Sequence, residues 1–171
     1  MAEINRHLLI VIVPLVLSNS LHMVIVKRNL LPAIHTPIWL WGFGRNKTWR
    51  GLIFVPVVNA IVLTLLSLSI SPYLAMPAVI GFVLGLAYMI FELPNSFLKR
   101  RLGMAPGENT GKHRIAFSML DKMDSAIGVV LMYLMLGYCT WQVALWLLLI
   151  ASATHIVVSA LLVMLRLKST F

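Results

Sequence analysis

The sequence predicts an all-α integral membrane protein with about five transmembrane helices, organised as a single domain over residues 1–171. The chain is 60% hydrophobic and only 11% charged, and its mean hydropathy is +0.94. A soluble domain has about 45–50% apolar and about 25% charged residues. Uncharged apolar runs are long enough to cross a bilayer, and the alternating polarity of a membrane β-barrel strand is missing.

The uncharged apolar runs locate the spans, since a helix needs about 20 such residues to cross the hydrocarbon. The first three spans are predicted at residues 8–26, 51–70 and 75–98. Residues 125–165 carry no charge and are too many for one helix. The sequence GYCT at 137–140 offers a break, so we predict a fourth span at 122–136 and a fifth at 141–165.

Basic residues predict the orientation of these spans. Every Lys and Arg except Arg6 falls between spans one and two, between spans three and four, or after span five. The positive-inside rule makes that side cytoplasmic. We therefore expect an outer N-terminus, a cytoplasmic C-terminus and two polar cytoplasmic loops, in a multi-pass protein of the cytoplasmic (inner) membrane.

The first cytoplasmic loop ends in GFGRNKTWRG, residues 42–51. Its glycines permit close approach of the backbone to a ligand. Asn46 or Thr48 would cap a helix predicted to start near Trp49, and free N–H groups at a helix start attract anions. The alternative is a polar cap among ordinary inner-leaflet cations. The candidate phosphate-binding residues here are Asn46, Lys47, Thr48 and Arg50.

The second cytoplasmic loop places three consecutive cations near a pair of acids. Lys99, Arg100 and Arg101 follow span three, and Asp121 and Asp124 form a D-x-x-D pair on one helix face. The pair falls in the predicted first turn, where the helix dipole favours carboxylates, so helix capping is one interpretation. The other is a magnesium site, because Mg²⁺ takes one or two carboxylates together with water and phosphates.

Two polar residues lie within the predicted spans. Glu92 is just inside span three, where an acid is by default a functional candidate, either as another metal ligand or in an ion pair with a loop cation. Asn19 in span one either faces the site or bonds to another helix. Gly81 and Gly85 form a G-x-x-x-G motif, which favours close helix packing and is compatible with a homodimer.

Together the two loops gather cations, carboxylates and glycines on one face, as a polyphosphate with Mg²⁺ requires. Nucleic acid is a poor alternative. Most of the net charge of +9 is accounted for by the basic residues that set the membrane orientation, and the loops are too short for a nucleic-acid-binding domain.

The second loop resembles the signature region of membrane cytidylyltransferases that make CDP-activated lipids. That pattern runs from an acid through S-x-x-K-R and a Pro-Gly turn to D-x-x-D. The sequence FGRNKTWRG and the five-span length narrow the resemblance to the CDP-archaeol synthase family. The matching positions are Ser96, Lys99, Arg100, Pro106, Gly107, Asp121 and Asp124.

The resemblance implies that CTP and a membrane lipid phosphate, phosphatidate-like or archaetidic-acid-like, give a CDP-lipid and pyrophosphate for phospholipid biosynthesis. The implied metal is Mg²⁺, held by Asp121, Asp124 and Glu92. The implied catalytic residues are Asp121, Asp124, Lys99 and Arg100. The residues expected to bind CTP or lipid phosphate are Asn46, Lys47, Thr48, Arg50, Ser96, Arg101, Lys122 and Asn19.

Two other functions remain open from the sequence. A CTP-dependent lipid kinase would pass the γ-phosphate to an alcohol and would need a base, for which an aspartate or His113 would serve. A non-catalytic transport or assembly subunit would more typically show charges within several spans, or internal repeats.

Overall fold

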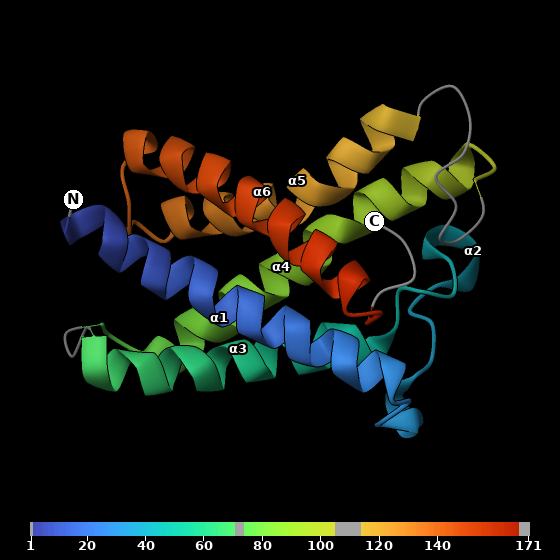
Figure 1. The fold of residues 1–171 in the computed structure, drawn as a ribbon, viewed down its shortest axis with the longest axis horizontal. Coiled ribbons are helices and arrows are strands. Elements are labelled where there is room, and N and C mark those ends of the chain that lie inside the picture. Colours follow the sequence, from blue (N-terminus) through green and yellow to red (C-terminus); the bar gives the residue numbers. More distant parts are fainter. Residues whose placement is uncertain (1, 71–73, 105–113, 168–171) are drawn as a thin grey trace.

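A computed structural model describes residues 2–70, 74–104 and 114–167. In this part of the chain the structure is built from helices (Figure 1). The elements are α1 (Ala2–Lys27), the 3-10 helix η1 (Pro32–Ile34), α2 (Leu40–Phe43), α3 (Trp49–Ile70), α4 (Pro77–Arg101), α5 (Arg114–Met135) and α6 (Trp141–Met164).

The predicted all-α membrane fold is confirmed. Within the described residues, four helices are long and apolar enough to cross a membrane, namely α1, α3, α4 and α6. Helix α5 carries a shorter apolar segment, Met123–Met135. Each predicted span therefore coincides with one helix. The predicted break before α6 is a turn in which Gly137 has a φ of 77°, a conformation that glycine adopts without steric cost.

Helix α4 runs through the middle of the bundle and contacts both α3 and α5. Helix α1 packs along α3 and touches α6, which packs against α5. In Figure 1 the long helices run back and forth, so that α2, the end of α4 and the start of α5 lie at one end of the molecule. The N-terminus and the α5–α6 turn lie at the other end. Both polar segments therefore meet at one end, and its assignment to the cytoplasm stays a prediction.

The G-x-x-x-G motif packs α4 closely against α3. A Cβ atom on Gly81 would lie 2.8 Å from the Ala60 Cα, and one on Gly85 would lie 2.7 Å from the Pro56 Cα. These are main-chain atoms that cannot turn aside, so the predicted role in close helix packing is confirmed. Because the motif contacts a helix of the same chain, it gives no support to the predicted homodimer.

Candidate functional site

Main-chain bonds hold the segment that carries Lys47 just before α3. Pro37 and Thr48 form an isolated antiparallel bridge. The Ile38 N–H donates to the Lys47 carbonyl oxygen at 2.9 Å. Helix α3 then begins at Trp49, where the sequence predicts a helix start. The short bridge thus fixes the backbone of Lys47 relative to the start of the helix.

The Lys47 side chain joins this segment to α4 through an ion pair with Glu92. Burial lowers the pKa of Lys47, but the charge and hydrogen bond of Glu92, together with the charges of Asp124 and Asp121, raise that pKa overall. All three predicted metal ligands therefore act on one ammonium group. Of the two roles predicted for Glu92, the structure contains the ion pair with a loop cation.

One face of α4 carries an acidic, an amide and a basic group. Glu92, Asn95 and Lys99 are spaced by three and four residues, so they share one side of the helix. The Lys99 ammonium forms an ion pair with Asp121 and donates to its Oδ2 atom. Lys99 is only 7% exposed, which makes this a nearly buried cation that has a carboxylate partner.

Asn95 joins the two aspartates of the D-x-x-D pair. Its Nδ2 atom donates to Asp121 Oδ1 at 2.6 Å and to Asp124 Oδ2 at 3.0 Å. The other oxygen of Asp124, Oδ1, accepts the main-chain N–H of Ser125 at 2.6 Å. The structure therefore brings together the aspartates, Lys99 and Lys47, as the sequence predicts, and adds Asn95, which sequence analysis missed. Its signal was its position on the same helix face as Glu92 and Lys99.

The prediction that Asp121 and Asp124 sit in the first turn of their helix was wrong. Helix α5 begins at Arg114, and its first turn holds no acidic residue. Charged residues between 114 and 122 made the sequence look like a loop, although a helix can extend beyond the hydrocarbon. Helix capping therefore does not explain the aspartates, which lie inside α5 and face α4.

Two of the predicted arginines bind main-chain oxygens. Arg50 is 1% exposed, and its Nη1 donates to the Leu30 carbonyl oxygen at 2.9 Å. Arg100 donates through Nη1 to the Met104 carbonyl oxygen. The Nε atom of each is buried with no hydrogen-bond partner in the described part of the chain. Each guanidinium therefore has a buried Nε donor that no described residue satisfies.

Ser96 and Arg101 contact their own helix. Ser96 Oγ donates to the Glu92 carbonyl oxygen at 2.9 Å, and the Arg101 guanidinium lies over the Phe97 ring at 5.3 Å from its centroid. Asn46 is exposed and Thr48 is buried. The predicted positions that fall outside the described structure are Pro106, Gly107, His113 and the side chain of Lys122.

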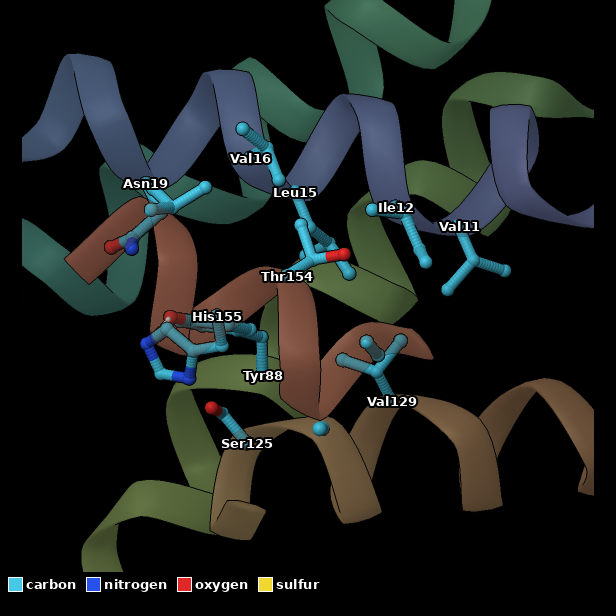
Figure 2. A pocket seen from close by; sticks show the side chains of 13 residues that line it. Val11, Ile12, Leu15, Val16, Asn19, Tyr88, Ser125, Val129, Thr154 and His155 are labelled. Atoms are coloured by element: carbon cyan, nitrogen blue, oxygen red, sulfur yellow. Dashed lines mark hydrogen bonds between the residues drawn. The ribbon is translucent and has the colours of Figure 1, made fainter. Parts of the chain in front are cut away.

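A groove beside the aspartates is lined by α1, α4, α5 and α6 (Figure 2). Four of its polar residues, Asn19, Tyr88, Ser125 and His155, lie toward one end, Thr154 lies near the middle, and Val11 and Val129 lie toward the other end. The Tyr88 hydroxyl lies 3.4 Å from His155 Nε2. The groove has a cavity volume of about 50 Å³. Because Ser125 follows Asp124, the polar end adjoins the carboxylates.

The oxygen atoms of the two aspartates suit a hard divalent cation. Asp121 and Asp124 place oxygen atoms against the same amide nitrogen, and oxygen ligands are those that Mg²⁺ prefers. No three His, Cys, Asp or Glu side chains among the described residues lie close enough together to hold a metal ion. An ion here would thus take two aspartates and complete its shell with other oxygens, as Mg²⁺ does with water and phosphate.

Comparisons with known proteins place both polar segments within one family match. A family model described as CarS-like CDP-archaeol synthase matches residues 41–171. A curated relative, the CDP-archaeol synthase of Pyrococcus furiosus, is 35% identical over 68 residues. That stretch covers 38% of this chain and 40% of the relative, so it spans less than half of either protein. No solved structure matches the chain.

Proposed function

The chain belongs to the CarS-like CDP-archaeol synthase family, and we propose that it transfers CMP from CTP to a membrane lipid phosphate. The products are a CDP-lipid for phospholipid biosynthesis and pyrophosphate. The observation that carries this proposal is the cluster of Lys47, Lys99, Asp121 and Asp124 at one end of the bundle, inside the family match. The lipid is phosphatidate-like or archaetidic-acid-like.

The physical difficulty of this reaction is charge, because the lipid phosphate and CTP are both anions. An oxygen of the lipid phosphate attacks the α-phosphorus of CTP, and the bond to the β-phosphate breaks as pyrophosphate leaves. The lipid phosphate is already ionised at neutral pH, so the protein needs no general base. Positioning and electrostatic stabilisation are then the whole task of the side chains.

Lys47 and Lys99 would provide positive charge for the phosphates. In the structure each pairs with a carboxylate, Lys47 with Glu92 and Lys99 with Asp121. Phosphate oxygens would compete for these ammonium groups. Arg100 and Arg50 stay predicted phosphate contacts, because arginine suits the geometry of phosphate. Asn46, Thr48, Ser96, Arg101 and Lys122 stay predicted contacts.

Mg²⁺ fits the donor set, and when bound it would neutralise the triphosphate and the leaving pyrophosphate. Asp121 and Asp124 would hold it through oxygens that Asn95 already orders. Glu92 stays a predicted further ligand, and in the structure its Oε2 atom pairs with Lys47.

The groove between α1 and α6 would take a lipid chain from the bilayer. Its wall is mainly apolar, and its polar end, with Asn19 and His155, adjoins the aspartates. A lipid with its phosphate at the carboxylates would thus lay its chains along the valines. CTP would enter from the polar end of the bundle, which we assign to the cytoplasm.

The test is to mix the purified protein in detergent with CTP, Mg²⁺ and a panel of ether-linked and acyl lipid phosphates. We expect pyrophosphate release, a CDP-lipid detected by mass, and loss of both when EDTA removes the metal. In a parallel reaction with a polyprenol in place of the lipid phosphate, formation of CDP and a phosphorylated polyprenol would instead identify a lipid kinase. No product from folded protein with any lipid would favour the non-catalytic subunit.

A further inference from the structure

The Asn95 amide nitrogen donates hydrogen bonds to both aspartates. A side-chain amide nitrogen carries two hydrogens, and here one nitrogen donates to both Asp121, at 2.6 Å, and Asp124, at 3.0 Å. Asn95 is 5% exposed, and its Oδ1 is buried without a hydrogen-bond partner among the described residues. The side chain thus uses its nitrogen to bind two carboxylates on another helix, while its oxygen accepts no hydrogen bond from the described residues.

Among the described residues, each oxygen of the two carboxylates accepts a hydrogen bond. Lys99 binds Asp121 Oδ2, the Ser125 N–H binds Asp124 Oδ1, and Asn95 binds the remaining two oxygens. A carboxylate has about four lone-pair sites. Each oxygen therefore retains capacity for a cation after its hydrogen bond is made.

Asn95 differs from Lys99 in how it holds the carboxylates. An ammonium group orients a carboxylate but repels a second cation, whereas a neutral amide orients it without that repulsion. The D-x-x-D spacing puts the aspartates on one face of α5, yet each side chain could still rotate. The amide from α4 keeps one oxygen of each aspartate beside the other.

We propose that Asn95 is a positioning residue that holds Asp121 and Asp124 together for a divalent cation. This inference rests on the proposed function, because the cation is the one that the proposed reaction requires. Hydrogen bonds to metal-binding carboxylates orient those ligands, and losing such a partner typically costs about 10–100-fold in metal affinity.

The test measures Mn²⁺ binding by electron paramagnetic resonance, with protein in detergent and without CTP or lipid. Asn95→Ala is expected to weaken Mn²⁺ binding by about 10–100-fold. Asn95→Ser keeps a shorter side chain with a single donor, and its Mn²⁺ affinity should fall between those of Asn95→Ala and the wild type. The serine variant also serves if the alanine variant does not fold.

Asn59 provides a matched control. It is 1% exposed, its Nδ2 donates to the Gly81 carbonyl oxygen at 2.6 Å, and its Oδ1 also has no partner among the described residues. Asn59→Ala removes an equally buried amide from the α3–α4 packing rather than from the aspartates. It should lower the unfolding temperature and leave the dissociation constant for Mn²⁺ unchanged.

Wild-type Mn²⁺ affinity in either folded Asn95 variant would overturn the proposal, and so would an equal loss of affinity in Asn59→Ala. The result is separable from the proposed function. If the wild type makes CDP-lipid while Asn95→Ala binds Mn²⁺ normally, only the role of Asn95 fails. If the wild type makes no CDP-lipid with any lipid phosphate, the reaction fails, whatever the metal measurements show.

Discussion

The Lys47 ammonium donates to the Glu92 carboxylate, and this ion pair ties the segment before α3 to the second half of α4. Both side chains are largely buried. On the same face of α4, Asn95 and Lys99 bind the aspartates of α5. Lys47, Lys99 and the predicted metal ligands therefore gather along one face of α4.

We expect Asp124→Asn to reduce CDP-lipid formation by about 100-fold or more while the protein stays folded, since losing one preorganised electrostatic contact has effects of that size. Pyrophosphate release measures the activity, and circular dichroism reports the fold. Arg166→Ala is the matched control, because Arg166 is exposed at the C-terminal end of α6 and we assign it to topology alone. Wild-type turnover in Asp124→Asn would remove this aspartate from the site.

Lys47→Met should lower thermal stability, because it leaves the largely buried Glu92 carboxylate without its partner. Adding Glu92→Gln should recover part of the loss, with a coupling energy of about 0.5–3 kcal/mol, as for other contacting pairs. Thermal unfolding of the two single variants, the double variant and the wild type measures this coupling. Strictly additive losses would show that the two groups do not stabilise each other.

Gly85→Ala should destabilise the protein by about 1–3 kcal/mol, the usual cost of overpacking. The added Cβ would lie 2.7 Å from the Pro56 Cα, a main-chain atom that cannot rotate away. Ala78→Val, at an exposed position of the same helix, adds bulk without such a contact and serves as the control. Unfolding temperatures in one detergent compare the two, and equal values would contradict the close packing of α3 and α4.

Ala151→Phe should raise the KM for the lipid phosphate several-fold and leave the KM for CTP unchanged. Ala151 lines the groove, so a phenyl ring there would occupy space assigned to a lipid chain. Ala153→Phe places the same ring on the exposed side of α6 and should change neither constant. An unchanged KM for the lipid phosphate in Ala151→Phe would show that the lipid chain does not bind in this groove.

The sequence by itself determined the number and approximate limits of the long helices, because crossing a bilayer depends on local apolar length. It also determined that Asp121 and Asp124 share a helix face, since that follows from a spacing of three residues. The start of α5 was missed because charged residues show only where a helix leaves the hydrocarbon. Main-chain hydrogen bonding decides where the helix itself begins.

Only the tertiary structure decided which groups meet. The partners Lys47 and Glu92, and Asn95 and Asp121, belong to different elements, and their contact depends on how each helix is rotated about its axis. Packing sets that rotation, as where Gly81 and Gly85 bring α4 against the α3 backbone. For this reason the polar loops of the sequence predict a phosphate and metal site, whereas the hydrogen bonds of Asn95 to both aspartates are visible only in three dimensions.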